Sequence, residues 1–214
     1  MASGIRIVLF DFGGVFTDSP FTAFEAMAAE IGAAPGQINE LMFGSYAEDG
    51  DHPWHRLERG EISLQAARDA ILEEAQRRHG LALDIYQLFA RMPRDGGLRQ
   101  AMVDEVRRLR DTGLGTAIIT NNVREFSDGW RGLLPVDELF DLVVDSSSEG
   151  VRKPGQEIFR RALERAGGLH PQQAVFLDDH PANVHAAEAL GIRGIRVEQD
   201  VQPAIDVLRR LLAS

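Results

Sequence analysis

The sequence predicts an α/β fold in which a parallel sheet carries helices on both faces and a helical segment interrupts the alternation after the first strand. Two observations support this prediction. In the second half of the chain, short apolar runs alternate with segments that repeat apolar residues at helical spacing. Residues from about 20 to 93, in contrast, hold helical patterns and no convincing strand.

Five apolar runs are the predicted strands. Each is short and nearly free of charge, which is typical of strands buried on both faces of a sheet. The first run is halted by Asp11 and the pair Gly13-Gly14. The predicted strands are Ile5–Phe10, Leu114–Ile119, Leu142–Val144, Ala174–Leu177 and Gly194–Val197.

The predicted helices of the sheet region repeat apolar residues every three or four positions, as Met102, Val106 and Leu109 do. Glycines follow three of these patterns, where helix C-terminal glycines are common. The glycines are Gly113, Gly167 and Gly191, and the predicted helices are Leu98–Arg110, Glu157–Ala166, Ala182–Leu190 and Pro203–Leu212.

The helical insert is most simply a small second domain. We therefore expect an α/β core made of residues 1–19 and 94–214 and an all-helical domain over residues 20–93. Within the insert, the predicted helices are Phe21–Ile31, Ile38–Phe43, Leu64–Arg78 and Ile85–Phe89.

Composition excludes several classes of function. Lys and Arg number 23 against 33 Asp and Glu, so the formal net charge is −10 and the chain as a whole does not attract nucleic acid or anionic membranes. The chain has no cysteine, which excludes disulfides and thiolate chemistry. The first ten residues do not resemble a signal peptide, and no apolar run approaches the roughly 18 residues of a membrane span. We expect a cytoplasmic protein.

Polar residues follow the predicted strands at their carboxyl ends. In an open parallel sheet these ends meet at one edge, where ligands bind. We therefore expect the side chains to lie close together. They are Asp11 after the first strand, Thr120, Asn121 and Asn122 after the second, Lys153 in the loop VRKPG after the third, and Asp178 and Asp179 after the fourth.

These residue types suit phosphoryl chemistry. Asp11, Asp178 and Asp179 would form the hard oxygen site that Mg²⁺ prefers. The metal ion lets the anionic Asp11 approach an anionic phosphate, and Lys153 balances the negative charge of both. The sequence thus predicts attack of Asp11 on phosphorus and an aspartyl-phosphate that water hydrolyses.

The predicted substrate is a small phosphate ester, and the oligomeric state cannot be read from the sequence. The Thr120 hydroxyl and the Asn121 amide are suited to hold phosphate oxygens, as are nearby backbone N–H groups. Gly13 and Gly14 allow the backbone to come close to metal and substrate.

Four segments resemble, in order, the four motifs of the haloacid dehalogenase-like (HAD) hydrolase superfamily. FDFGGV is similar to the first motif, IITNN to the second, RKPGQEIF to the third and FLDDHPANVHAAEALGI to the fourth. The resemblance extends over almost the whole chain. It implies a Rossmann-like core with a five-stranded parallel sheet, and it identifies the helical insert as a cap that gates substrate access.

The resemblance also implies roles for individual residues. It makes Asp11 the nucleophile, with Thr120 and Asn121 as phosphate contacts and Lys153 as the third-motif lysine. It makes Asp179 a direct metal ligand and Asp178 its support, and the Gly13 carbonyl completes the metal shell. The stretch RLERGEIS resembles caps of the branch near bacterial sugar-phosphatases and the phosphatase domain of soluble epoxide hydrolase.

One position departs from the family pattern. Family phosphatases carry a second aspartate two residues after the nucleophile, where this chain has Gly13. That aspartate is a general acid and base, a role worth roughly 10²–10⁴ in rate, and glycine cannot supply it. Another group such as Asp18, His180 or an ordered water substitutes, or the activity is weak, or it is lost. Some members of the similar branch resemble this DFGG pattern and are regarded as phosphatases, which favours hydrolysis.

Two alternative functions remain open at this point. A 2-haloacid dehalogenase would use Asp11 to attack carbon without a metal, although Asp178 and Asp179 would repel its carboxylate substrate. A catalytically weak relative would bind phosphorylated ligands only. The aromatic residues Phe43, Tyr46 and Trp54 either line the substrate pocket or form the core of the insert.

Overall fold

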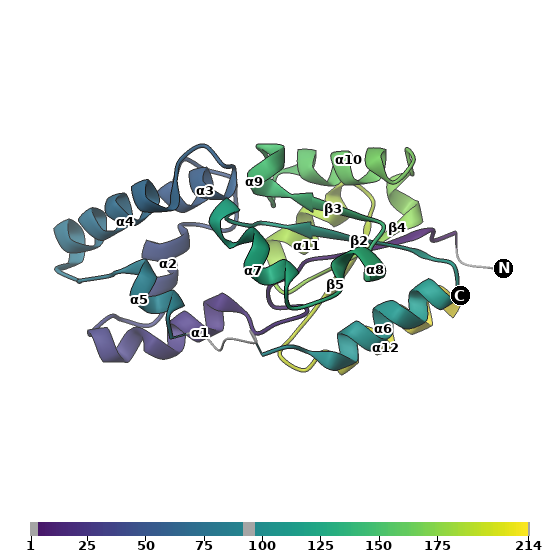
Figure 1. Ribbon diagram of the computed structural model, residues 1–214, viewed down its shortest axis with the longest axis horizontal. Coiled ribbons are helices and arrows are strands. Elements are labelled where there is room, and N and C mark those ends of the chain that lie inside the picture. Colours follow the sequence, from purple (N-terminus) through teal and green to yellow (C-terminus); the bar gives the residue numbers. More distant parts are fainter. Residues whose placement is uncertain (1–3, 92–96, 214) are drawn as a thin grey trace.

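The computed structural model describes residues 4–91 and 97–213. A central parallel sheet carries helices on both faces, and the helices within residues 20–89 form a separate group at one side (Figure 1). The predicted five-stranded α/β fold is confirmed, and the predicted strand ends shift by one or two residues at most. The strands are β1 (Ile7–Phe10), β2 (Gly115–Thr120), β3 (Leu142–Asp145), β4 (Ala174–Asp178) and β5 (Arg193–Arg196).

The strand order places the first strand in the middle of the sheet. The order is β3-β2-β1-β4-β5, and each neighbouring pair is parallel. The chain runs outward from β1 through β2 to β3 and then returns to the other side of β1. The direction of winding therefore changes at β1, and the carboxyl end of a strand at such a switch point is where ligands bind in open α/β sheets.

The two faces of the sheet are covered by different helices. Alternate side chains of β1 point to opposite faces, so Val8 and Phe10 lie in one hydrophobic cluster and Ile7 and Leu9 in another. Helices α6 and α12 cover the first face and α10 and α11 the second (Figure 1). Their bounds are Gln100–Asp111 for α6, Gln202–Ala213 for α12, Gln156–Arg165 for α10 and Pro181–Ala189 for α11.

The predicted helix ends are confirmed by left-handed glycines. Gly113, Gly167 and Gly191 have φ angles of 80°, 96° and 92°, which glycine adopts without steric cost. Several short elements were not predicted, because one or two turns carry no recognisable repeat of apolar residues. They are α3 (Pro53–Glu58), α7 (Ser127–Arg131), α8 (Val136–Leu139), α9 (Ser146–Glu149) and the 3₁₀ turns Arg124–Phe126 and Pro171–Gln173.

The described part of the insert contains helices joined by loops and no strand, as expected. Its helices enclose a hydrophobic cluster of their own, with Phe24, Ile38 and Ile71 among the buried residues, and the sheet region adds Val123. Besides α3, the elements are α1 (Pro20–Met27), the 3₁₀ turn Ala28–Ile31, α2 (Gln37–Phe43), α4 (Leu64–His79) and α5 (Ile85–Phe89). The expected boundary at residues 93 and 94 lies outside the described residues, and the division into domains stays a prediction.

Several polar contacts join the insert to loops at the carboxyl ends of the strands, and the two shortest come from Glu58 and Leu64. The Arg152 guanidinium Nε lies 2.7 Å from the Glu58 carboxylate, and both side chains are buried. At the start of α4, the backbone N–H of Leu64 donates to the Glu125 carboxylate at 2.8 Å. These contacts hold α3 and α4 against the strand ends. In the described part of the chain, no helix has both the length and the apolar character to cross a membrane.

Candidate active site

A buried lysine joins carboxylates from the two central strands. Asp11 directly follows β1, and Asp178 is the last residue of the neighbouring β4. Lys153 Nζ lies 2.8 Å from Asp11 Oδ1 and 2.7 Å from Asp178 Oδ2. Lys153 and Asp178 are completely buried. The predicted convergence of the strand ends on one point is therefore observed for these three side chains.

Asp179 adds a third carboxylate beside the lysine. Ligand oxygens of Asp11, Asp178 and Asp179 lie within 4.8 Å of one another. Burial and then the charge of Asp178 raise the pKa of Asp179 to about 6. Burial also raises the pKa of Asp11 well above its usual range, with further increases from the two neighbouring carboxylates, and Lys153 only partly opposes this. Three carboxylates facing one ammonium form a site that attracts a cation.

Asp178 is held by several donors. The Asn183 amide donates to both of its oxygens at 3.1 Å, and the backbone N–H of His180 donates to Oδ1 at 2.7 Å. With Lys153 on Oδ2, the Asp178 carboxylate is fixed within the protein. Asn183 Oδ1 is buried and has no partner among the described residues. Asp179, which is less buried, stays more accessible than Asp178 to a ligand from outside.

Gly14 is required by the position of Asp179. Its φ is 75°, in the left-handed region that favours glycine. A Cβ atom at this position would lie 2.1 Å from Asp179 Oδ2, which is far inside van der Waals contact. Only a residue without a side chain lets the turn after Asp11 pass this close to Asp179.

Asn121 holds the backbone of Lys153. The backbone N–H of Lys153 donates to Asn121 Oδ1 at 2.8 Å, and Asn121 Nδ2 donates to the Lys153 carbonyl at 2.9 Å. Both polar atoms of the amide are therefore engaged with the protein. The sequence predicted a phosphate contact for this side chain, whereas the described contacts make it a positioning residue for Lys153. A contact of Asn121 with phosphate stays a prediction.

Thr120 and Gly13 lie beside these residues. Thr120 ends β2 and is buried, and its hydroxyl donates to the Asn121 carbonyl at 3.5 Å. Gly13 follows Asp11 by two residues and lines the cavity above it. The nearest atom to a Cβ added at Gly13 would be Pro20 Cδ at 3.8 Å, an ordinary contact. A Cβ atom at this position would therefore meet no clash.

The cavity above Asp11, here named the inner chamber, has a volume of about 150 Å³. One side is polar and comes from the sheet region, and the other comes mainly from the insert. The polar side consists of Asp11, Gly13, Asn121, Asn122, Lys153, Asp179, His180 and Asn183. The other side consists of Pro20, Phe21, Phe43, Tyr46, Trp54, Glu58, Phe89, Val123 and Phe126. The aromatic residues of the insert thus line the chamber as well as forming its hydrophobic cluster.

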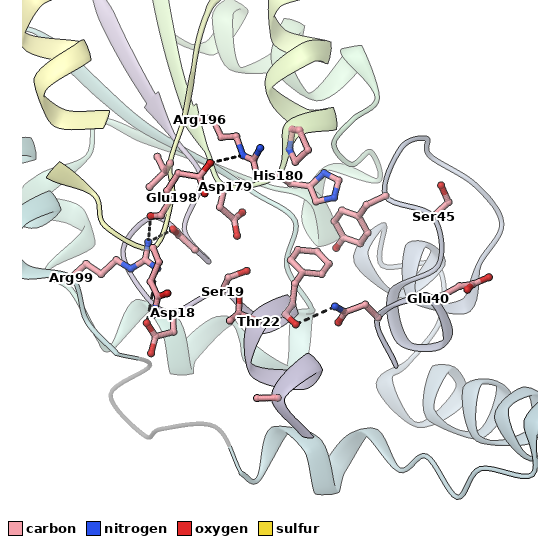
Figure 2. A pocket seen from close by; sticks show the side chains of 18 of the residues that line it. Asp18, Ser19, Thr22, Glu40, Ser45, Arg99, Asp179, His180, Arg196 and Glu198 are labelled. Atoms are coloured by element: carbon pink, nitrogen blue, oxygen red, sulfur yellow. Dashed lines mark hydrogen bonds and ion pairs between the residues drawn. The ribbon is translucent and has the colours of Figure 1, made fainter. Parts of the chain in front are cut away.

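A larger cavity of about 730 Å³, the outer cavity, adjoins the inner chamber. The two share Phe21, Tyr46, Asp179 and His180. Figure 2 shows this cavity between Asp179 and His180 on one side and Ser19 and Thr22, which flank the beginning of the insert, on the other. The outer cavity is therefore a route by which a ligand could reach the carboxylates.

Sequence reasoning missed a second polar cluster, which supports the loop after β2. Asn122 Nδ2 donates to Asp145 Oδ2 at 2.7 Å, and Asp145 Oδ1 accepts from the backbone and hydroxyl of Ser147 at 2.9 and 2.7 Å. Asp145 is buried. Its only sequence signal was an acidic residue at the end of a predicted strand. The same signal identified Asp11 and Asp178, so it was available and was not used.

Comparisons with known proteins agree with the fold and the motifs. A profile of haloacid dehalogenase-like hydrolases matches residues 5–191. The chain is 32% identical over 211 residues to acyl-CoA dehydrogenase family member 10 of Mus musculus. This alignment covers 97% of this chain and 19% of that protein. It is 24% identical over 206 residues to bifunctional epoxide hydrolase 2 of Mus musculus, and this alignment covers 90% of this chain and 36% of that protein. The chain thus spans only a part of the length of these two relatives.

A relative of matching length is the sesquiterpene phosphatase of Aspergillus oryzae, 26% identical over 223 residues with 99% of each chain covered. Among solved structures, a HAD-like family hydrolase from Porphyromonas gingivalis has a TM-score of 0.63 at 25% identity, with 96% of this chain and 98% of that chain covered. A HAD family enzyme from Bacteroides thetaiotaomicron, solved with magnesium and inorganic phosphate, has a TM-score of 0.61 at 22% identity. The match covers 91% of this chain and 95% of that chain.

A dehalogenase structure also has this fold, with a TM-score of 0.69 at 20% identity and full coverage of both chains. Similarity at this level of identity establishes the fold and does not choose between phosphate esters and haloacids. The four ordered motifs, the observed sheet and the matching profile lead to the same family. The chain belongs to the haloacid dehalogenase-like hydrolases.

Proposed function

We propose that this protein is a Mg²⁺-dependent phosphatase that acts on a small phosphate ester through an aspartyl-phosphate on Asp11. The observation that supports this most is the group of three carboxylates around the buried Lys153 ammonium. Phosphatases among the relatives, such as the sesquiterpene phosphatase of Aspergillus oryzae, support the same activity. The magnesium and phosphate bound by the Bacteroides enzyme support the choice of metal and reaction.

The residues of the site fit a magnesium ion. Carboxylate oxygens are the donors that Mg²⁺ prefers, and the lysine leaves part of their charge unbalanced. The unpartnered Asn183 Oδ1 adds a buried acceptor that a metal-bound water would satisfy. Asp11 and Asp179 would hold the ion, with Asp178 in support and the Gly13 carbonyl as a further ligand. When bound, the ion reduces the repulsion between the carboxylates and an anionic substrate.

The residues of this chain then have separate tasks. The Lys153 ammonium, fixed by Asn121, balances the charge of Asp11 and of the phosphate. An Asp11 oxygen attacks phosphorus while the ester P–O bond breaks, which leaves an aspartyl-phosphate and an alkoxide. Because Gly13 offers no acid, the alkoxide takes its proton from water. Attack of the resulting hydroxide on phosphorus releases hydrogen phosphate and restores the Asp11 carboxylate.

The helical segment is proposed to be the cap over this site. Its aromatic residues form one side of the inner chamber, so that substrate and bulk water are separated when it lies against the strand ends. The buried pair of Glu58 and Arg152 fastens it there. This arrangement supports the proposed domain division, residues 20–93 against 1–19 and 94–214.

The same carboxylates disfavour the dehalogenase alternative. A 2-haloacid carries its own carboxylate, and two aspartates at the end of β4 would repel it. Only one of the three carboxylates is needed as a nucleophile for attack on carbon. A phosphate ester makes use of all three, because the cation that they attract also binds phosphate oxygens.

We expect Asp11→Asn to abolish phosphate release from 4-nitrophenyl phosphate in the presence of Mg²⁺. Loss of the nucleophile should lower kcat by roughly 10⁴-fold or more, because an amide cannot form the intermediate. The exposed Asp128→Asn serves as the matched control and should keep the wild-type rate. Equal rates for wild type and Asp11→Asn would refute the assignment of the nucleophile.

Gly13→Asp should restore the missing acid, because a Cβ atom at this position meets no clash and the position lines the chamber. The rate with alkyl phosphates should rise by roughly 10²–10⁴, the usual contribution of a general acid. The gain should be smaller with 4-nitrophenyl phosphate, whose leaving group needs no proton. Gly13→Asn adds the same volume without an acid and should give no gain. Equal rates in the Asp and Asn variants would contradict the account of this position.

Thermal unfolding at different pH values tests the cation site. In the unfolded chain Asp179 has its ordinary pKa of about 3.9, whereas burial raises the pKa to about 6 in the metal-free folded protein. Between these values the folded protein binds more protons, so its free energy of unfolding decreases as the pH rises through the window. At pH 7.5, Mg²⁺ at a hundredfold excess over its Kd should raise the free energy of unfolding by about 2.7 kcal/mol. At pH 5 the increase should be much smaller, because protons compete with the ion for Asp179. A Mg²⁺ effect that is equal at both pH values, or unchanged in Asp179→Asn, would argue against the site.

A further inference from the structure

The inner chamber has two unlike ends, and this bears on the substrate. We infer that the alcohol part of the substrate is a small apolar group, about the size of one ring, which the aromatic wall of the chamber selects. The inference rests on the proposed phosphatase activity and adds the class of ester. It concerns the part of the substrate that reaches beyond the phosphate.

The wall opposite the carboxylates is a continuous set of aromatic rings. Neighbouring rings contact one another at centroid separations that are usual for aromatic pairs. The separations are 4.7 Å for Phe21 and Phe43, 4.8 Å for Phe21 and Tyr46, 5.2 Å for Phe43 and Trp54, 5.8 Å for Trp54 and Phe89, and 5.0 Å for Phe89 and Phe126. All six side chains line the chamber.

The polar atoms in this wall are already engaged. Glu58 Oε1 accepts hydrogen bonds from the Tyr46 hydroxyl and from Trp54 Nε1, the latter at 2.8 Å. Glu58 Oε2 accepts from Arg152 Nε at 2.7 Å, and Arg152 also stacks over the Tyr46 ring at 4.7 Å. Among the described residues that line this side, Glu58 is the one charged group. Its charge is balanced by the buried Arg152.

Near this end one polar atom of the lining is without a partner among the described residues, His180 Nδ1 beside the Phe21 and Tyr46 rings. An alcohol with several hydroxyls would therefore leave most of them unpaired. A sugar brought into the chamber loses the water around its hydroxyls, and the nearby protein acceptors are bonded to other donors. An apolar group loses no hydrogen bonds and gains contact with the rings. The polar end, with Lys153 and Asp11, receives the phosphate. The chamber is thus complementary to an ester that is charged at one end and apolar at the other.

The volume limits the size of the apolar group. The chamber measures about 150 Å³. An apolar protein cavity of about 150 Å³ holds a molecule such as benzene, and here the phosphate takes part of the same space, so one ring is the upper limit for the apolar group. A longer chain would have to pass beside Phe21 and Tyr46 into the outer cavity, which has charged residues such as Asp18, Arg99 and Glu198 in its wall. A compact group is the better match for the chamber.

A matched pair of esters tests the inference. Cyclohexylmethyl phosphate and glucose 6-phosphate both carry a six-membered ring on a primary alcohol, so they differ mainly in their hydroxyls. We expect kcat/KM in Mg²⁺ to be at least ~10²-fold higher for the cyclohexyl ester, the usual penalty for a hydroxyl in an apolar pocket. Equal or higher kcat/KM for glucose 6-phosphate would overturn the inference and leave the phosphatase standing. Hydrolysis of neither ester, nor of 4-nitrophenyl phosphate, would overturn both.

Variants locate the preference in the wall. Phe126 is only partly buried, and Phe126→Ala should lower kcat/KM roughly tenfold more for the cyclohexyl ester than for glucose 6-phosphate. Tyr86 is 41% exposed and does not line the chamber, so Tyr86→Ala is the control and should change neither rate. An equal loss for both esters in Phe126→Ala would count against selection by the wall.

Binding without turnover gives an independent readout. The chain has two tryptophans, Trp54 in the chamber wall and Trp130 beside Phe12. In Trp130→Phe, benzylphosphonate, which cannot be hydrolysed, should change the fluorescence of Trp54 in a saturable way, and methylphosphonate should change it much less. The same response to both phosphonates would show that the ring does not enter the aromatic end, against the inference.

Discussion

The buried ammonium of Lys153, held between Asp11 and Asp178, is the interaction on which the rest of the site depends. Burial favours the neutral form of a lysine and would lower its pKa, but the charges of the two aspartates outweigh burial and raise the pKa of Lys153. Removing either partner would leave an uncompensated buried charge, which is strongly destabilising. The lysine and the carboxylates therefore require one another, and the fold has to bring them together.

The sheet accomplishes this by its strand order. Because β1 and β4 are neighbours and parallel, Asp11 and Asp178 emerge side by side at one edge. Asn121, from the other neighbour of β1, fixes the backbone of Lys153 with two hydrogen bonds. Asp179 then adds a charge that the lysine does not balance, and this excess is the physical basis for the proposed cation site. The aromatic insert closes the opposite side, so the same chamber is charged at one end and apolar at the other.

Much of this arrangement could be predicted from the sequence. A parallel strand buried on both faces is a continuous apolar run, so Ile7–Phe10 and its partners stood out, and the aspartates that end such runs were visible too. Contacts between distant residues left no local signal. Glu58 and Arg152 are 94 positions apart, and nothing near either residue indicates the pair. The clamp of Asn121 on Lys153 was hidden for the same reason, and the phosphate contact predicted for Asn121 stays a prediction. Helices of one or two turns, such as α9, were too short to show a period.

The most direct test of the central claim is to locate a cation in crystals grown with Mn²⁺, which takes the same oxygen ligands as Mg²⁺ and scatters anomalously. The account predicts one strong anomalous peak with oxygens of Asp11 and Asp179 roughly 2.0–2.3 Å away, and Lys153 still paired with Asp178. Saturating Mn²⁺ without a peak between these carboxylates, or with a peak only elsewhere on the protein, would contradict it.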